Sequence, residues 1–311
     1  MKISVVMAIY NGFEFITEQL DSIRTQTRPV NEVVMCDDGS KDNSVSMVQT
    51  YIEKYNLKNW KIYVNEKNLG YANNFYKAMQ LSTGDLIVFS DQDDIWINDR
   101  IEKMERCFLN NEDIRVLYSE FDLFYTSEDV TRVSSPVIKE MKHDRTIEKI
   151  SLCPSKIFIK TEGCTMALRR DFLRQIEPYW FSGFAHDEFV WKMALCVDGL
   201  YVLHESTLKR RIHGNNVSTS KLHNYKKRVA FLENLCAGHK AMLAFAKHCG
   251  MAKKDIKLIL DNVRSSDMRL KMLRDKKLLY IFPLVLRYSH CYYSIKAIPV
   301  EFFMALRGKN E

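Results

Sequence analysis

The sequence has no Cys-x-x-Cys pair and no cysteine–histidine cluster with the spacing of a zinc site, although eight cysteines occur among its 311 residues. We therefore expect reduced, mostly buried thiols in a cytoplasmic protein. No apolar run reaches the roughly 20 residues that a transmembrane helix needs. Met1 and Lys2 lead directly into an apolar segment, without the cleavage region of a signal peptide.

The glycine loops that commonly hold nucleotide phosphates are also missing. Neither a G-x-G-x-x-G motif nor a Walker loop follows the first apolar segment, where the sequence reads Tyr10-Asn11-Gly12-Phe13. A sugar nucleotidyltransferase would need a basic, glycine-rich loop at this point, and an aspartyl phosphatase would need an aspartate. A diphosphate bound by this chain would therefore need another source of positive charge, such as a metal ion.

Charge is distributed unevenly along the chain. The net charge is +7, but residues 221–311 contain 19 lysines and arginines against 7 acidic residues, which leaves residues 1–220 with a net charge of −5. A hydrophobic content of 46% is sufficient for a sizeable core. We predict two regions, a catalytic domain over residues 1–220 and a basic helical region over residues 221–311.

Four short apolar runs alternate with helical periodicity in the first part of the chain. The predicted buried strands are Ile3–Ile9, Val33–Cys36, Lys61–Val64 and Asp85–Phe89. The segments between them place apolar residues three and four positions apart, as amphipathic helices do. This alternating order predicts an α/β fold with a mostly parallel, doubly wound sheet flanked by helices.

Three carboxylates follow the fourth predicted strand within four positions: Asp91, Asp93 and Asp94. In open α/β sheets, ligands bind beyond the carboxyl ends of the strands. Adjacent carboxylates repel one another, and their oxygens suit Mg²⁺ or Mn²⁺, ions that bridge to phosphates. The cluster indicates a metal–diphosphate site, although an acidic turn or a helix N-cap would produce the same pattern.

The ordered set of motifs over about residues 1–215 resembles family 2 glycosyltransferases of the GT-A fold. The segments that carry this resemblance are 5–11 (VVMAIYN), 36–42 (CDDGSKD), 68–70 (NLG) and 83–94 (TGDLIVFSDQDD). The resemblance implies a Rossmann-like sheet with a helical C-terminal extension, and a nucleotide-sugar donor.

The resemblance also implies roles for individual residues. Those expected to hold the nucleotide base and ribose, or to line the same pocket, are Ala8, Tyr10, Asp37, Asp38, Asn68 and Gly70. Asp91 and Asp93 match the family's DxD signature, with Asp93 as the main metal ligand and Asp91 near the ribose or the metal. Asp94 and Trp96 follow as structural or substrate-side neighbours. Without the resemblance, residues 37–40 would be interpreted as an ordinary turn with a helix cap.

A second acidic motif, His186-Asp187-Glu188, opens a segment with helical periodicity. Acidic residues are common at helix N-termini, so capping is one interpretation. An inverting transfer needs a base to deprotonate the acceptor hydroxyl, and the His-Asp pair resembles the family's base motif. We therefore expect Asp187 to be the base, with Glu188 as the second candidate.

A histidine ends the segment Arg210-Arg211-Ile212-His213. A lone histidine is more often structural, but this segment resembles the part of the family that closes over metal and diphosphate. The resemblance implies His213 as the third metal ligand and Arg210 or Arg211 near the phosphates. The other predicted elements are a strand at 200–204, a strand pair at 115–118 and 120–125, and a loop or short helix over 127–150.

From residue 221 onward the periodicity is helical, and the last part mixes aromatic and aliphatic residues with Arg287, Lys296 and Arg307. This combination suits a membrane interface. A helical cap on the catalytic core, or a contact between subunits in an oligomer, would need similar residues. Charge alone would allow nucleic-acid binding, but no recognition motif supports it, so we expect no nucleic-acid partner.

The motifs together predict a metal-dependent, inverting glycosyltransferase that uses Mg²⁺ or Mn²⁺. Segments 89–96, 186–187 and 213–216 look most similar to bacterial cell-surface polysaccharide rhamnosyltransferases, which implies dTDP-rhamnose as the donor. A UDP-hexose, glucose or galactose, is the alternative. The expected acceptor is a lipid-linked or growing polysaccharide, reached by a peripheral protein on the inner face of the cell membrane. A non-catalytic membrane-docking adaptor is the alternative of another class, and it predicts no nucleotide binding.

Overall fold

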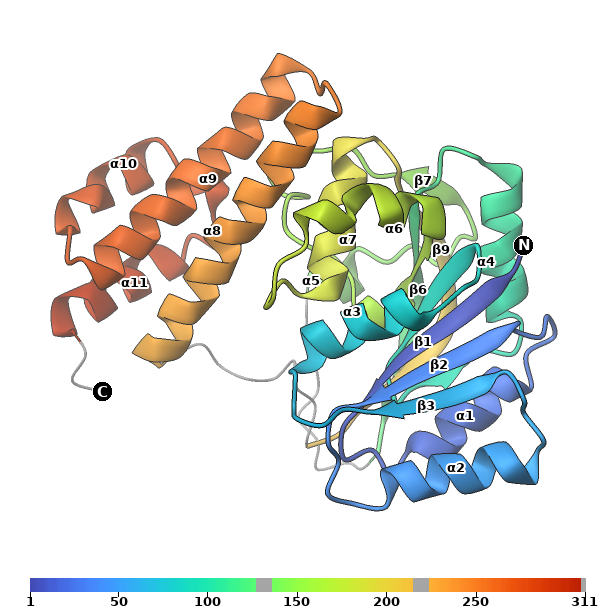
Figure 1. Ribbon diagram of the computed structural model, residues 1–311. Coiled ribbons are helices and arrows are strands. Elements are labelled where there is room, and N and C mark those ends of the chain that lie inside the picture. The colour runs from blue at the N-terminus through green and yellow to red at the C-terminus, as the bar shows by residue number, and fades with distance from the viewer. Residues whose placement is uncertain (127–135, 215–223, 309–311) are drawn as a thin grey trace. The chain divides into compact units, whose positions relative to one another are not determined.

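The computed structural model describes residues 1–126, 136–214 and 224–308, which belong to two compact units (Figure 1). The first unit comprises residues 1–150, 160–194 and 198–216, and the second comprises residues 151–159, 195–197 and 217–311. The boundary expected between residues 220 and 221 lies in the segment 215–223, which is outside the described residues.

Two short segments from the first part of the chain belong to the second unit. The ring of Phe158 contacts the rings of His239 and Tyr293 edge-on, with centroids 6.2 and 6.0 Å apart. The thiol of Cys196 lies 3.8 Å from the carbonyl oxygen of Met242. The sequence pattern did not indicate these contacts, because they join residues that are about 50 to 130 positions apart.

The first unit is built on one sheet with the strand order β3-β2-β1-β4-β8-β6-β9-β5, and β7 pairs with β9. Its parallel half consists of β1 (Ile3–Ile9), β2 (Glu32–Asp37), β3 (Trp60–Val64) and β4 (Leu86–Ser90). The intervening helices are α1 (Ile16–Arg24), α2 (Ser44–Lys54) and α3 (Tyr71–Leu81). The predicted α/β order is confirmed, and all four parallel strands end at the same edge of the sheet.

The central strands form because their residues are nearly all apolar. Every residue of β4 is buried, as expected for a strand with both faces covered. α1 buries Ile16, Leu20 and Ile23 at helical spacing, and these side chains join the core cluster with the strands. This packing fixes where the strand ends lie.

The other half of the sheet is mixed. β8 (Met166–Arg169) pairs antiparallel with both β4 and β6 (Val116–Tyr125), while β9 (Leu200–Ile212) runs parallel to β6. β5 (Ile95–Trp96) and β7 (Ile147–Lys149) pair antiparallel with β9. The remaining helices of this region are α4 (Arg100–Asn110), α5 (Pro136–Lys139), α6 (Arg170–Ile176) and α7 (His186–Cys196), with the 3₁₀ turns η1 (Gly163–Thr165) and η2 (Glu177–Tyr179).

Two strand predictions in this half are wrong in extent. The predicted pair at 115–118 and 120–125 is one strand, β6, whose register shifts near Ser119 and Glu120. These polar residues look like a turn in the sequence, but they are buried and bonded. Ser119 Oγ lies 2.7 Å from Thr207 Oγ1, and Glu120 Oε1 lies 2.8 Å from His204 Nδ1. β9 was predicted to end at residue 204, but it continues to Ile212 alongside the second part of β6.

The segment predicted as a loop or short helix over 127–150 is described only in part. Residues 127–135 lie outside the described residues. α5 confirms the short helix, and β7 is a strand that the polar sequence did not indicate.

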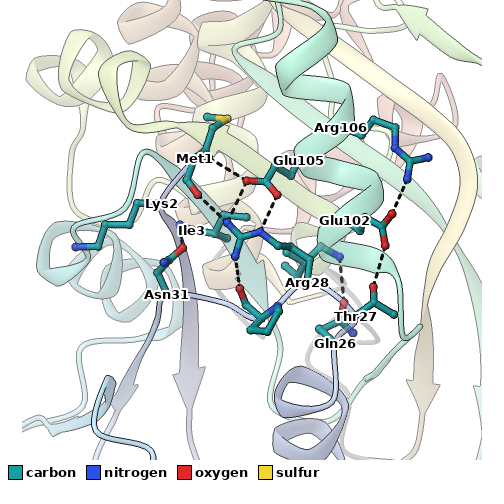
Figure 2. Close-up of polar contacts among 12 residues, drawn as sticks. Met1, Lys2, Ile3, Gln26, Thr27, Arg28, Asn31, Glu102, Glu105 and Arg106 are labelled. Atoms are coloured by element: carbon teal, nitrogen blue, oxygen red, sulfur yellow. Dashed lines mark hydrogen bonds and ion pairs between the residues drawn. The ribbon is translucent and has the colours of Figure 1, made fainter.

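Far from the strand ends, α4 is tied to the segment after α1 (Figure 2). Arg28 donates from Nε and Nη2 to the carboxylate of Glu105 at 2.9 and 3.2 Å, and the amino group of Met1 donates to it at 3.0 Å. Thr27 donates to Glu102 on the same helix at 3.1 Å. These bonds hold α4, whose first residue, Arg100, reaches the site described below.

The second unit contains α8 (Tyr225–His248), α9 (Lys253–Arg274), α10 (Ile281–Leu286) and α11 (Ala297–Arg307), with the 3₁₀ turns η4 (Leu278–Tyr280) and η5 (Ser289–Cys291). The helical prediction for this region is confirmed. α8 packs along α9, and α10 and α11 pack against α9. No described helix combines the length and the apolar composition needed to cross a membrane.

Candidate active site

The loop after β4 is held to the end of β1 by the side chain of Gln92. Its Oε1 accepts from the backbone N–H of Tyr10 at 2.9 Å, and its Nε2 donates to the Tyr10 carbonyl at 3.0 Å. Gly12 leaves room for this amide, because a Cβ at that position would clash with Gln92 Oε1. The acidic loop, residues 91–94, is therefore fixed by contacts within the protein itself.

Asp93 faces the segment at the end of β9. Its Oδ2 lies 2.8 Å from Nε2 of His213, and its backbone carbonyl accepts from Nε of Arg211 at 2.7 Å. Arg211 also pairs with Glu18 at 2.6 Å and lies over the ring of Phe15. The structure thus brings together Asp93, Arg211 and His213, three of the residues singled out in the sequence.

Asp94 is buried beside Arg211, near the end of β9. Its Oδ1 accepts from the backbone N–H of Arg211 at 3.0 Å, whereas its buried Oδ2 accepts no hydrogen bond from the residues that the structure describes. Burial and the charge of Asp93 raise the pKa of Asp94 to about 6. The buried guanidinium of Arg100 donates to the Cys164 carbonyl at 2.7 Å, and burial lowers the pKa of Arg100 to about 10. Arg100 supplies nearby positive charge.

Asp91, Asp94 and Cys164 each place a possible ligand atom within 4.8 Å of the others. Burial, and then the charges of Asp94 and Asp93, raise the pKa of Asp91 well above its ordinary value. Clustered carboxylates whose ionisation is disfavoured gain from a nearby divalent cation, so the two carboxylates of this group fit one. Among the described residues, the group does not include Asp93 or His213, the other expected ligands. Burial also raises the pKa of the Cys164 thiol, and a protonated thiol is a poor ligand for Mg²⁺ or Mn²⁺.

The predicted nucleotide-side aspartates follow β2, and backbone N–H groups occupy their carboxylates. Asp37 accepts from the N–H of Gly39 at 3.0 Å. Asp38 accepts from the N–H groups of Leu69 and Gly70 at 2.7 and 2.9 Å. Both aspartates are buried. Asp37 fixes the turn at the end of β2, and Asp38 joins that turn to the turn before α3.

The other predicted pocket residues lie on the same two turns and on β1. Asn68 donates from Nδ2 to the Asp38 carbonyl at 3.0 Å. Gly70 has a φ of 79°, a left-handed conformation that favours glycine at this turn. Ala8 is half-buried in β1, and the ring of Tyr10, just after β1, is exposed. These residues therefore gather at the carboxyl ends of neighbouring strands.

Asp187 is the second residue of α7. The backbone N–H of Glu188 donates to its Oδ1 at 2.8 Å. Burial raises the pKa of Asp187 to about 6, and the charges of Glu188 and Glu162 add to the shift. The carboxylate of Glu188 is ion-paired with the buried ammonium of Lys192. Of the two candidate bases, Asp187 is thus the one whose pKa is raised by burial, whereas Glu188 is held in an ion pair.

Glu162 links the acidic loop to Asp187. Its carboxylate lies 3.4 Å from Nη2 of Arg210, and its charge raises the pKa of both Asp91 and Asp187. At the next residue, Gly163, an added Cβ would lie 3.2 Å from Cβ of Asp187. The turn η1 therefore runs close to both groups, and both belong to the first unit.

His186, beside Asp187, is buried in an aromatic sandwich. Its ring stacks on Phe75 with centroids 3.8 Å apart and meets Phe89 edge-on at 4.9 Å. Neither ring nitrogen has a hydrogen-bond partner among the described residues, and burial lowers the pKa of His186 to about 3. The ring is therefore neutral and anchors the start of α7.

Comparison with known proteins identifies the family. The sequence model of glycosyl transferase family 2 matches residues 4–176, more than half of the chain. The chain belongs to this family. The match includes β1 to β4 and the acidic loop, and the family's activity is the transfer of sugars from nucleotide-sugar donors. Asp187 and His213 lie beyond the matched residues.

Among the relatives of this glycosyltransferase whose names state an activity are two bacterial enzymes. One is the UDP-Glc:alpha-D-GlcNAc-diphosphoundecaprenol beta-1,3-glucosyltransferase WfgD of Escherichia coli, 24% identical over 72% of this chain and 83% of its own. The other is the dTDP-rhamnosyl transferase RfbG of Shigella flexneri, 27% identical over 68% of this chain and 72% of its own.

Solved structures show the fold. The glycosyltransferase is similar to Staphylococcus aureus TarS residues 1–349 in complex with UDP-GlcNAc, with a TM-score of 0.66 and 19% identity over 99% of this chain and 88% of the other. It is also similar to the mannosyltransferase PcManGT of Pyrobaculum calidifontis in complex with GDP-Man and Mn²⁺, with a TM-score of 0.54 and 15% identity over 100% and 88%. The predicted GT-A fold is confirmed.

Three contributors to the glycosyltransferase site were missed in the sequence. Gln92 occupies the middle position of the DxD motif, and its bonds to the end of β1 depend on the neighbouring strands. Glu162 stands in a loop between strands. Its acidic side chain before Gly163 was the only sign in the sequence that it could belong to the site. The sequence around Arg100 indicates only the start of a helix, and the burial of Arg100 beside Cys164 is evident only in the tertiary structure.

Proposed function

We propose that this glycosyltransferase transfers a sugar from a nucleoside-diphosphate donor to an acceptor hydroxyl with inversion at the anomeric carbon. The observation that carries the proposal is the course of residues 162–163: Glu162 lies 3.4 Å from Arg210 beside the acidic loop, and a Cβ at Gly163 would lie 3.2 Å from Cβ of Asp187. The acidic loop can hold a divalent cation that offsets the charge of the departing phosphates, and Asp187 can accept a proton. An inverting transfer needs both functions in one place.

The residues proposed to hold Mg²⁺ or Mn²⁺ are Asp91, Asp93 and His213. Carboxylate oxygens and an imidazole nitrogen suit Mn²⁺, and the oxygens alone suit Mg²⁺. When bound, the ion supplies positive charge that offsets the charge on the leaving diphosphate. The Mn²⁺ complex of the Pyrobaculum mannosyltransferase supports a divalent ion. Arg210, beside Glu162, and Arg211, bonded to the Asp93 carbonyl, add fixed positive charge near the acidic loop.

Asp187 is proposed as the base. A carboxylate with a pKa of about 6 is mostly ionised at neutral pH and is a better proton acceptor than an ordinary aspartate. It would take the proton of the acceptor hydroxyl as the oxygen attacks the anomeric carbon. Glu188 is the second candidate, because its ion pair with Lys192 favours a structural role.

The nucleotide base and ribose are proposed to lie against the ends of β1 and β2. Ala8, Tyr10, Asn68 and Gly70 would line this pocket. Asp37 and Asp38 would act mainly by fixing the turns, since backbone N–H groups already occupy their carboxylates. Each would contact the nucleotide through its remaining lone pairs.

The proposed donor is dTDP-rhamnose, supported by the similarity to the Shigella rhamnosyl transferase. A UDP-hexose is the second candidate, supported by the Escherichia coli glucosyltransferase and by the UDP-GlcNAc complex of TarS. The proposed acceptor is a lipid-linked or growing polysaccharide, in line with the diphosphoundecaprenol-linked acceptor in the name of the Escherichia coli relative.

A thermal-shift panel tests the site and the donor together. The full chain is heated with dTDP-rhamnose, UDP-glucose, UDP-galactose and UDP-GlcNAc, each with and without Mn²⁺. A ligand that binds the native state raises the melting temperature by mass action. One donor should stand out, and only with the metal present. No shift with any donor would favour a non-catalytic adaptor.

The Asp93→Asn variant should lose the metal-dependent shift and the transfer. Asp113→Asn is the matched control, because Asp113 is exposed in a turn before β6. Proton NMR of the first product formed from the preferred donor then gives the anomeric configuration. A product that keeps the donor's configuration would overturn the inverting mechanism.

A further inference from the structure

The stretch from η4 to α11 in the second unit leaves many large apolar side chains exposed. Leu286 is 82% exposed, Leu279 is 78% exposed and Ile295 is 67% exposed. We call the set the apolar face; its members are Leu279, Phe282, Val285, Leu286, Tyr293, Ile295, Val300, Phe303 and Leu306. Such exposure in one region marks an interaction site rather than ordinary surface.

The apolar face follows helical spacing. In α10 and the turn before it, Leu279, Phe282 and Leu286 recur three and four positions apart, while Leu284 is buried. α11 is divided in the same way. It exposes Val300, Phe303 and Leu306 at steps of three and buries Ile298, Glu301 and Ala305 on its other side. Both helices are therefore apolar on the exposed side as well as apolar over most of the buried side.

The exposed charge within residues 276–308 has one sign. The exposed basic residues of this stretch are Lys276, Lys277, Arg287, Lys296 and Arg307. Between residues 276 and 308 the single acidic residue is Glu301. It is buried, and it accepts from Nε and Nη2 of Arg269 at 2.9 and 2.7 Å. Residues 276–308 therefore present no carboxylate to the solvent.

We propose that the apolar face docks on the surface of an anionic phospholipid bilayer. Apolar side chains would enter the interface while the lysines and arginines meet the lipid phosphates. α10 and α11 have six and eleven residues, too few to span the bilayer, so they would lie in its surface. A second copy of the chain is a poorer partner, because it would bring five more cations against the same five.

This inference does not depend on the proposed reaction, since vesicle binding is measured without any donor or acceptor. The full chain is sedimented with vesicles of phosphatidylcholine alone or with 30% phosphatidylglycerol. We expect binding to the anionic vesicles, weakened at high salt, and little binding to the neutral ones. Equal binding to both would overturn the role of the basic residues, and binding to neither would overturn the docking surface.

The double variant Phe282→Ser, Leu286→Ser should bind anionic vesicles at least tenfold more weakly, since two large apolar side chains no longer enter the interface. Leu109→Ser is the matched control, because Leu109 on α4 is 61% exposed, the same as Phe282, and lies in the first unit. Circular dichroism checks that each variant is folded. Unchanged vesicle binding by the folded double variant would overturn the proposal.

Light scattering tests whether the apolar face binds a second copy of the chain and not a membrane. If the wild-type chain is a dimer without lipid and the double variant is a monomer, the face joins two copies and the membrane proposal is wrong. Replacing Lys277 and Arg287 with glutamate should reduce binding to anionic vesicles severalfold and leave the mass in solution unchanged.

Discussion

Nε2 of His213 lies 2.8 Å from Oδ2 of Asp93, although the two residues are 120 positions apart in the chain. The contact closes the acidic loop after β4 with the segment that follows β9. In the proposed metal site, His213 would either ligate the same ion as Asp93 or orient the Asp93 carboxylate. Either role ties metal affinity to the imidazole.

His213→Ala should weaken the affinity for Mn²⁺ by about tenfold or more, because a ligand or its supporting hydrogen bond is lost. The measurement is a Mn²⁺ titration followed by electron paramagnetic resonance, in which free and bound ions are distinguished. His290→Ala, at an exposed position in the second unit, is the control. An unchanged Mn²⁺ affinity would show that His213 has no part in the metal site.

Gly12→Ala should destabilise the first unit and displace the acidic loop, since its Cβ would clash with the amide of Gln92. Overpacking of this kind costs about 1–3 kcal/mol. Denaturant unfolding measures the loss of stability, and the affinity for the donor shows whether the acidic loop has been displaced. Gly214→Ala is the control for stability, because an added Cβ there meets nothing within 4 Å. Adding Gln92→Ala to Gly12→Ala should recover stability but not donor binding. If Gly12→Ala alone left both stability and donor binding intact, the hydrogen bonds between Gln92 and Tyr10 would not be needed to position the acidic loop.

Transfer should depend on the ionisation of Asp187. Because the base acts as a carboxylate and its pKa is about 6, kcat/KM should fall about tenfold per pH unit below that value and level off above it. Glu162→Gln removes a neighbouring negative charge, so the pKa of Asp187 should drop and the midpoint should move to lower pH. Glu148→Gln, on β7, serves as the comparison. A midpoint that stays in place in Glu162→Gln would mean that another group controls the profile.

Acid should destabilise the protein through His186. Burial holds its pKa at about 3 in the folded state, against about 6.5 in the unfolded chain, so the unfolded state binds a proton first as the pH falls. This linkage removes about 2 kcal/mol of stability between pH 7.5 and pH 5. His186→Leu removes the group, and its stability should vary less over the same range. Urea unfolding at the two pH values measures the difference, and equal slopes in wild type and variant would contradict the account.

The acidic loop and the parallel strands could be predicted because their signals are local. Each strand is a continuous apolar run, and the three carboxylates follow one of them within four positions. β6 and β9 could not be bounded, because Ser119, Glu120 and His204 are polar residues that satisfy one another only across the sheet. A polar residue in an exposed turn and a polar residue buried in a sheet cannot be distinguished from the sequence alone.

The sequence by itself determined the alternating strands and helices of the parallel half of the sheet, the family and the residue types available for binding a cation and accepting a proton. It did so through periodicity and motifs that need only neighbouring residues. Only the tertiary structure decided that Gln92 clasps the end of β1, that Glu162 acts on both Asp91 and Asp187, and that residues 276–308 present apolar and basic side chains without an exposed carboxylate. Hydrogen bonds, burial and charge interactions depend on distance through space, and the chain order does not contain that distance.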